Sequence, residues 1–415
     1  MTGACLRVGG VNAETEALRV QEPRPPRVAV VHWGSTGGGP LFHLHLAGAV
    51  AVAAPHRTVV CSSASSDQRA RYAVLQVPHQ SVDLPSDLPR SPRGWLGVIR
   101  AVARVRRFLQ RQHVDVVVIA MESPHLFLLA PFLRGRRRRV VFGLHDPDFH
   151  PGERSMVKVA ARFMTIASSD GLLTWSHAAE VVLRKKLQSS KMACFSTVHG
   201  AYGRPAAQPR TLDANARVTL GFFGRIQPYK GVGMLLSAFQ ELSAATVDKY
   251  RLVIYGEGEL PVDPDPATIG DVELYNRWIA DSEVPSLLRG IDIMVLPYLE
   301  ASQSGVLALA LAAGVPSVAT PVGGLREQIE DSGAGVVAEA VSPGALADAV
   351  QRLAMNPDGY RSLSAAALNS AAGAYSWERV AVDVDAVARS VHSRPAASLL
   401  TRLRAATLLS RRRPT

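Results

Sequence analysis

Cysteine is scarce in this chain of 415 residues, where only Cys5, Cys61 and Cys194 occur. Three cysteines do not suggest a disulfide framework, and they favour a reducing, cytosolic compartment. The sequence also lacks any run of about 18 apolar residues, so it predicts no transmembrane helix. Residues 1–26 lack the apolar core of a signal peptide, and we interpret them as a loose leader.

Aromatic residues are also few, at 6% of the chain. No interleaving of basic and aromatic residues resembles a nucleic-acid recognition motif, which argues against a nucleic-acid-binding protein. The hydrophobic fraction of 47% and the charged fraction of 20% are typical of a soluble globular protein. The formal net charge is +11, which indicates an anionic partner: nucleic acid, an anionic membrane or a phosphorylated substrate.

Short β-branched runs alternate with helical patterns along most of the chain, which predicts βαβ units and parallel sheets. The alternation lapses near residues 200–215, a stretch rich in Pro, Gly and Ala, and then restarts. We therefore predict an α/β fold with two Rossmann-like domains that face each other across a cleft. The expected parts are a leader at 1–26, a first domain at 27–205, a second domain at 213–375, a helix returning to the first domain at 376–392 and a basic tail at 393–415.

The second half opens with a strand that ends at Gly224, followed by two cations, Arg225 and Lys230, around a turn. Gly231 then leads into an amphipathic helix. Both cations follow the carboxyl end of the strand, so they can converge on one anion, and a departing diphosphate needs such neutralisation. The alternative is a solvated turn with ordinary surface charges.

A small polar stretch, Ser302-Gln303-Ser304-Gly305, separates the next apolar strand from an Ala/Leu-rich helix. The free N–H groups and the dipole of a helix N-terminus favour a phosphate, Gly305 permits close backbone approach, and the hydroxyls of Ser302 and Ser304 can add donors. The alternative is a helix that Ser304 merely caps.

Two segments, "GRIQPYKGV" and "SQSGVLALALAAGVPSVATPVGGLREQI", resemble the donor-binding half of the family-4 retaining glycosyltransferases, which have the GT-B fold. "GSTGGGP" in the first half resembles the first Gly-rich loop of the family, and "HDPDFHPGE" resembles the loop that carries its active-site histidine. "SWERVAVDVDAVARS" resembles its last helix. The resemblance covers about residues 27–390 and includes a donor loop of the Ser-Gln-Ser-Gly kind.

The resemblance implies transfer of a hexose from a UDP- or GDP-sugar, with retention and with neither an essential metal nor another cofactor. The acceptor would be a glycan, a lipid-linked molecule or a small molecule. His145, Arg225 and Lys230 would be catalytic, with His145 near the sugar on the acceptor side. Further implied donor contacts are Gly224, Trp278, Ile279, Ser302, Gln303, Ser304, Gly305 and Val306. Gly37, Gly38 and Gly39 would leave room for phosphate or acceptor.

The sequence departs from the family at its usual pair of glutamates. Ala301 and Leu309 occupy the two expected positions, and Glu300 lies one residue early. Gln303 is a candidate for the sugar hydroxyls, against the alternative that it braces the loop.

Histidines and aspartates near the first domain's loops raise the question of a metal site. Asp146, Asp148 and His150 surround His145, but prolines interrupt their spacing and no second cluster supports them, so we predict no metal. His43 and His45 do not share a helix face and are weaker candidates still, as is His32.

The basic tail carries six arginines and no acid between Arg394 and Thr415, interleaved with leucines at 399, 400, 403, 408 and 409. This pattern suits a short interfacial helix outside the catalytic fold. We expect a cytoplasmic protein that docks on the inner face of an anionic membrane, helped by Arg136–Arg139. The alternative is solvated surface charge.

Two other functions remain open. A nucleotide-sugar epimerase would keep the fold and the donor site but change the reaction, and a basic nucleic-acid-binding protein would use neither. Stabilisation by UDP or GDP distinguishes the enzymes from the binding protein, and salt-dependent retention of polynucleotide would favour the latter.

Overall fold

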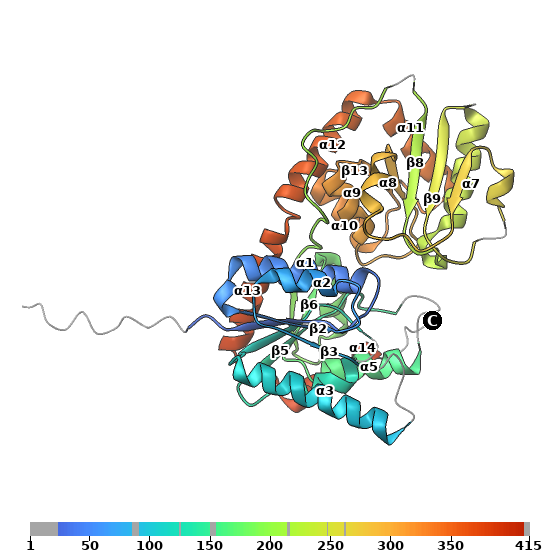
Figure 1. Ribbon diagram of the computed structural model, residues 1–415. Helices are drawn as coiled ribbons and strands as arrows, with labels where there is room; N and C mark the ends of the chain where they lie inside the picture. The colour runs from blue at the N-terminus through green and yellow to red at the C-terminus, as the bar shows by residue number, and fades with distance from the viewer. Residues whose placement is uncertain are drawn as a thin grey trace, which may run out of the picture.

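The computed structural model describes residues 24–84, 91–123, 126–149, 155–213, 216–246, 248–260 and 263–410, with the side chain of Phe127 excepted. Figure 1 shows two α/β domains, the first below and the second above. Each contains one parallel sheet, of seven and six strands. The predicted fold class is therefore confirmed. Most of the predicted leader, residues 1–23, lies outside the described residues, as do His150 and Arg411–Arg413.

The sheet of the first domain has the order β3-β2-β1-β4-β5-β6-β7, with every pair parallel. Its central strands are short runs of Val and Ile that are buried on both faces, as a parallel sheet covered by helices requires. The strands are β1 (Val28–Val31), β2 (Thr58–Ser63), β3 (His79–Val82), β4 (Val116–Ile119), β5 (Arg139–Gly143), β6 (Gly171–Thr174) and β7 (Ala193–Ser196).

Helices cover both faces of this sheet, and several begin at a serine whose side chain accepts a backbone N–H. Ser91 caps α3, Ser155 caps α5 and Ser176 caps α6. The helices are α1 (Gly38–Ala53), η1 (Pro55–Arg57), α2 (Arg69–Tyr72), η2 (Ala73–Leu75), α3 (Pro92–Arg111), α4 (Leu126–Leu133), α5 (Met156–Ala167) and α6 (His177–Lys186).

The second domain has a parallel sheet of order β10-β9-β8-β11-β12-β13 around a core of its own. Its strands are β8 (Val218–Phe223), β9 (Tyr250–Tyr255), β10 (Val272–Tyr275), β11 (Ile293–Leu296), β12 (Ser317–Ala319) and β13 (Gly335–Val337). Its helices are η3 (Pro228–Lys230), α7 (Val232–Ala245), η4 (Pro266–Thr268), α8 (Val284–Arg289), α9 (Gly305–Ala313), α10 (Gly323–Ser332), α11 (Pro343–Ala354) and α12 (Pro357–Ala372).

After α12 the chain returns to the first domain as α13 (Trp377–Ser393). The apolar face of α13 packs on α1 and against β4 and β5, and its residues Trp377, Val380 and Val384 belong to the core of the first domain. Figure 1 shows this crossing on the left of the molecule. Loops that follow strands of both sheets meet between the domains, where His145 after β5 contacts Gln303 after β11.

The tail does not lie outside the catalytic fold, so that expectation is wrong. Residues 399–410 form α14 (Leu399–Ser410), which packs along α5. Ala405, Ala406 and Leu409 are buried in the core of the first domain, and Arg402 donates to the carbonyl of Ala167 at 2.6 Å. The leucines predicted an amphipathic helix at a membrane surface. Part of its apolar face instead packs into the core of the first domain.

We expect Leu409→Ala to lower the free energy of unfolding by about 2–5 kcal/mol, because it opens a cavity between α14 and the sheet. Leu400 is 58% exposed, so Leu400→Ala is the matched control and should change stability by less than about 0.5 kcal/mol. Chemical unfolding followed by tryptophan fluorescence measures both. Equal effects of the two substitutions would contradict the position of α14.

Candidate active site

The first element of the site is the turn that follows β8. Gly224 has φ of +121°, a conformation that other residues rarely adopt, and Gly256 at the end of β9 approaches its backbone closely. A Cβ on Gly256 would lie 1.9 Å from the carbonyl oxygen of Gly224. Arg225 follows on this tightly packed turn and is exposed at the carboxyl end of the sheet.

Lys230 is held in place by the loop that follows β11. Gly231 adopts φ of +69°, and a Cβ there would lie 1.9 Å from the carbonyl oxygen of Pro297. Leu299 donates its N–H to the carbonyl of Tyr229 at 2.8 Å. The ammonium of Lys230 lies 3.7 Å from the ring centroid of Tyr298, a cation–π contact. The lysine is thus fixed beside the stretch that contains Gln303.

Ser304 caps the N-terminus of α9, as the second of the two interpretations of the sequence predicted. Its hydroxyl accepts the N–H of Leu307 at 3.3 Å and contacts the hydroxyl of Tyr298 at 3.1 Å. Its own N–H donates to Oε1 of Gln328 at 2.6 Å, and the residue is buried. The capping interpretation is therefore observed, and donation by the Ser304 hydroxyl to a phosphate stays a prediction.

The glycine pair after β12 lets the start of α10 pack directly on the Ser-Gln-Ser loop. A Cβ on Gly324 would lie 1.9 Å from the carbonyl oxygen of Ser302, and one on Gly323 would lie 2.2 Å from that of Ala301. From the first domain, Ser176 donates its hydroxyl to the same Ser302 carbonyl at 2.6 Å. The loop is therefore fixed by contacts from both domains.

His145 brings the first domain into the site. It lies two residues beyond β5, where its Nδ1 hydrogen-bonds to Oδ2 of Asp146 at 2.6 Å. Its Nε2 contacts the side-chain amide of Gln303 in the second domain. The other end of that amide is buried without a partner. Whichever way the amide is turned, one end meets His145 and the other remains available to a ligand.

The surroundings of His145 favour its charged form. Burial acts to lower the pKa of His145, but the Asp146 carboxylate and, more weakly, Glu122 outweigh it, so the pKa is raised above 6.5. The charge of Lys230 acts in the opposite direction, which places Lys230 within electrostatic reach of His145. Protonated His145 consequently stabilises the folded chain below pH 6.5, and that contribution is lost as the pH rises through its folded pKa.

The first Gly-rich loop encloses a histidine. A Cβ on Gly34 or Gly39 would lie 2.5 or 2.7 Å from Nε2 of His32, which is buried without a partner. The need for glycine at position 39 therefore has a cause inside the domain, and its assignment as room for phosphate or acceptor stays a prediction. Gly38 faces open space, and Gly37 has φ of +87°.

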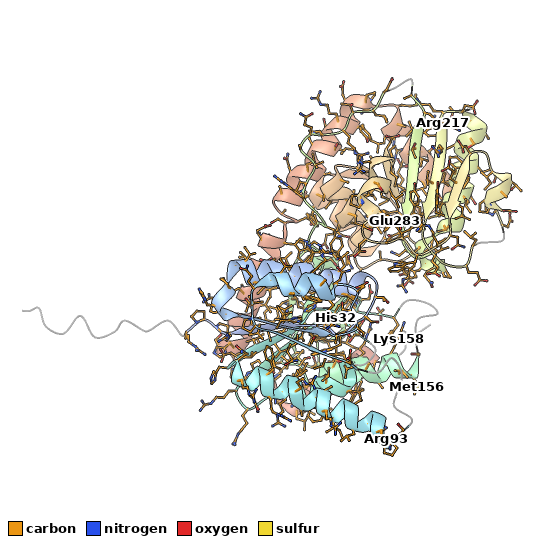
Figure 2. All side chains as sticks on the ribbon, viewed as in Figure 1. His32, Arg93, Met156, Lys158, Arg217 and Glu283 are labelled. Atoms are coloured by element: carbon orange, nitrogen blue, oxygen red, sulfur yellow. The ribbon has the colours of Figure 1, made fainter. Side chains whose placement is uncertain are left out.

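The loop predicted to contact a nucleobase divides into an exposed and a buried residue. Trp278 is 51% exposed and faces Gly37 of the first domain, where a Cβ would lie 3.8 Å from the indole. Figure 2 shows Glu283, just beyond this loop, on the side of the second domain that faces the first. Ile279 and Val306 are buried in the core, so their side chains are not open donor contacts.

Other contacts between the domains had no clear signal in the sequence. Glu327 on α10 accepts the N–H groups of His177 and Ala178 at the start of α6, at 2.7 and 2.5 Å. Gln68 donates to Asp281 at 2.8 Å. Their sequence separations of 150, 149 and 213 residues explain why local patterns did not reveal them.

The described residues that were weighed as metal ligands have other partners. Asp146 pairs with His145, and Asp148 pairs with Lys186. His43 is buried between Tyr72 and the carbonyl of Val30, and His45 stacks on Trp377. Among the described residues, no group of three or more His, Cys, Asp or Glu side chains could hold a metal ion.

Two family models match the chain, one to each domain. Residues 36–203 match the model described as Glycosyltransferase Family 4, and residues 217–356 match the one described as Glycosyl transferases group 1. The structure superposes on that of HepE from Anabaena in complex with UDP with a TM-score of 0.64 at 15% identity, covering 88% of this chain and 100% of that one. The chain has the two-domain GT-B fold, and each domain is similar to one of these glycosyltransferase models.

Sucrose-phosphate synthase from Thermosynechococcus elongatus shares this GT-B fold, with a TM-score of 0.64, 17% identity, and coverage of 88% of this chain and 98% of that one. A D-inositol 3-phosphate glycosyltransferase from Catenulispora acidiphila is 30% identical over 261 residues, which are 58% of this chain and 62% of that protein. One from Geodermatophilus obscurus is 33% identical over 189 residues, 42% of this chain and 41% of that protein. The matches thus span less than two thirds of these curated relatives.

We expect Asp146→Asn to lower the pKa of His145, because burial then meets less opposing charge. Histidine side-chain NMR across a pH titration measures it. Asp148→Asn, on the same loop but paired with Lys186, is the control and should leave the value unchanged. A pKa of His145 that responds equally to both substitutions would contradict the arrangement.

Proposed function

We propose that the protein transfers a hexose from a nucleotide sugar to an acceptor hydroxyl with retention of configuration. The observation that carries the proposal is the contact of His145 from the first domain with Gln303 from the second, near enough to Lys230 for its charge to act on the histidine. Lys230 would supply a cation for a diphosphate, Gln303 an amide with one end without a partner for a sugar hydroxyl, and His145 a group on the acceptor side.

The second domain would bind the donor. Lys230 and Arg225 would neutralise the diphosphate, and backbone N–H groups at the start of α9, near Gly305, would add donors. Trp278 would lie beside the nucleobase, with Ile279 contributing only through its backbone. UDP is the favoured nucleotide, because structural neighbours bind UDP and UDP-glucose. The Ser-Gln-Ser-Gly loop would assign the chain to a branch in which Gln303 replaces a glutamate at the sugar.

In the reaction, the bond between the anomeric carbon and the diphosphate breaks and a bond to the acceptor oxygen forms on the same face. The diphosphate takes the electron pair, and a diphosphate oxygen can accept the proton of the acceptor hydroxyl. Lys230 stabilises the departing charge. Both ring nitrogens of His145 face other side chains, Asp146 and Gln303, so we assign His145 a polar contact to the sugar as that bond breaks and not the role of base.

The experiment combines a donor panel with an acceptor panel and analyses the products by mass spectrometry and NMR. Stabilisation by UDP or GDP, followed by a product whose anomeric configuration matches the donor, supports the proposal. An epimerised nucleotide sugar formed without acceptor would favour the epimerase instead. Retention of polynucleotide without stabilisation by nucleotide would favour the nucleic-acid-binding alternative.

We expect Lys230→Ala to lower kcat by about 100-fold or more, because the departing diphosphate loses a fixed cation. Arg225→Ala should act in the same direction. Lys249 precedes β9, and Lys249→Ala is the matched control, with near-normal turnover expected. Near-normal turnover of folded Lys230→Ala and Arg225→Ala would remove the basis of the assignment.

We expect transfer to continue in the presence of EDTA, because two cations and a helix N-terminus already balance the diphosphate. The measurement compares initial rates before and after chelation, with and without added Mg²⁺ or Mn²⁺. Loss of turnover on chelation, restored by either metal, would contradict metal independence.

A peripheral position on an anionic membrane also belongs to the proposal. Arg402 of α14 donates a hydrogen bond to the carbonyl of Ala167, the last residue of α5. Together α5 and α14 expose the apolar residues Met156, Val157, Leu399, Leu400 and Leu403. Lys158 is exposed next to Met156 and Val157, and Arg404 is exposed next to Leu403. Figure 2 shows Met156 and Lys158 at the end of α5, clear of the second domain. Among the described helices, none is long and apolar enough to cross a membrane.

We expect replacement of Leu399, Leu400 and Leu403 by Ser to weaken binding to anionic vesicles by about tenfold or more, through lost apolar burial. Flotation with anionic and neutral vesicles measures this. Serines at the exposed Val52, Val74 and Val382, beside the core on the opposite face of the sheet, are the control. Equal flotation with neutral and anionic vesicles, or no difference between the two triple variants, would refute this membrane surface.

A further inference from the structure

The first domain contains a cavity whose residues take no part in the proposed binding of the donor. It has a volume of about 200 Å³ and lies between the loops after β4 and β5 and the helix α5. Its polar walls are Glu122, Ser123, Asp146, Asp148, Lys158 and Arg162. Leu126, Phe142 and Phe149 supply apolar surface. Such a mixture of apolar walls and a few polar groups is typical of a small-molecule site.

The cavity adjoins the point where the domains meet. Asp146 lines it and hydrogen-bonds to His145, whose other nitrogen contacts Gln303. Glu122, on the opposite wall, is close enough to affect the charge of His145. A molecule bound next to Asp146 would therefore lie close to the contact between His145 and Gln303, on its acceptor side.

One wall group has no partner inside the protein. Ser123 is only 7% exposed, and its hydroxyl is buried without a hydrogen bond. Buried hydroxyls are normally paired, because an unpaired one has lost its water without replacement. Since Ser123 lines the cavity, a hydroxyl of a bound molecule can supply the missing hydrogen bond.

The described residues of the wall carry more negative than positive groups. Among them are three carboxylates, Glu122, Asp146 and Asp148, and two cations, Lys158 and Arg162. The guanidinium of Arg162 is already committed, because Nε and Nη2 donate to the Glu122 carboxylate at 2.7 and 3.1 Å. The ring centroid of Phe149 lies 3.7 Å from its central carbon. The two-pronged geometry that binds phosphate is therefore occupied.

We propose that this cavity, acting with the donor site of the proposed function, holds an acceptor that is uncharged and rich in hydroxyls, such as a single sugar or cyclitol ring. Ser123 and the carboxylates of Glu122 and Asp146 bind its hydroxyl groups. The relatives are named for a phosphorylated acceptor, inositol 3-phosphate. The acceptor of this chain differs from theirs in lacking that phosphate at this position.

The test measures binding of three probes to the full chain saturated with UDP: myo-inositol, methyl glucoside and inositol 3-phosphate. Titration followed by ligand-observed NMR gives each Kd. At least one uncharged probe should bind, and about tenfold more tightly than inositol 3-phosphate. Ser123→Ala should weaken the uncharged probe by about threefold to tenfold. Ser168→Ala, whose hydroxyl bonds to Met164 within α5, is the matched control and should leave binding unchanged.

Glu122→Gln is a second variant. It removes one negative charge and weakens the ion pair that fixes the guanidinium of Arg162. It should bring the affinity for inositol 3-phosphate closer to that for the uncharged probe. Tighter binding of inositol 3-phosphate by the unmodified chain overturns the inference, and so does failure of both uncharged probes to bind. UDP binding is read in the same titrations, so its failure identifies a fault in the proposed function instead.

Discussion

The contact between His145 and Gln303 is the constraint on which the rest of the site depends. His145 follows a strand of one sheet and Gln303 follows a strand of the other, so the contact exists only when the carboxyl ends of both sheets meet. Asp146 fixes one side of the imidazole and Gln303 fixes the other. Helix α13, which returns to the first domain and packs on α1, and the bonds from Glu327 to the start of α6 hold the domains in this position.

The glycines of the site serve close packing more than ligand binding. At Gly231, Gly256 and Gly324 a Cβ would lie about 1.9 Å from a backbone oxygen, so these positions bring one loop directly against the next. The Gly-rich spacing that resembles a phosphate-binding pattern thus has a structural cause as well. Lys230 owes its position to two of these contacts, the approach of Gly231 to Pro297 and the bond from Leu299 to Tyr229.

The sequence predicted the parallel sheets well where strands are central and apolar. The central strands β1, β4, β8 and β11 are runs of apolar residues, mostly Val, Ile, Leu and Phe, which form the alternating pattern that predicted the sheets. The strands β3, β7 and β10 lie at sheet edges and are only partly buried, so their residues carry a weaker apolar signal.

The candidate site was predicted in its residues but not in all its roles. Arg225, Lys230, Gln303 and His145 follow the strands as expected, because a strand and its loop are local features. The capping role of Ser304 and the packing of α14 depend on partners distant in the sequence. The cavity beside Asp146 was not predicted, since its walls come from three separate segments.

The central claim is that His145 and Lys230, from different domains, act on one bound donor. A double-mutant cycle on kcat/KM with His145→Ala, Lys230→Ala and the double variant tests it most directly. Residues that act on the same group give losses that do not add, so the double variant should lose little more than the worse single variant. Losses whose logarithms simply add, with all three variants folded, would contradict the account.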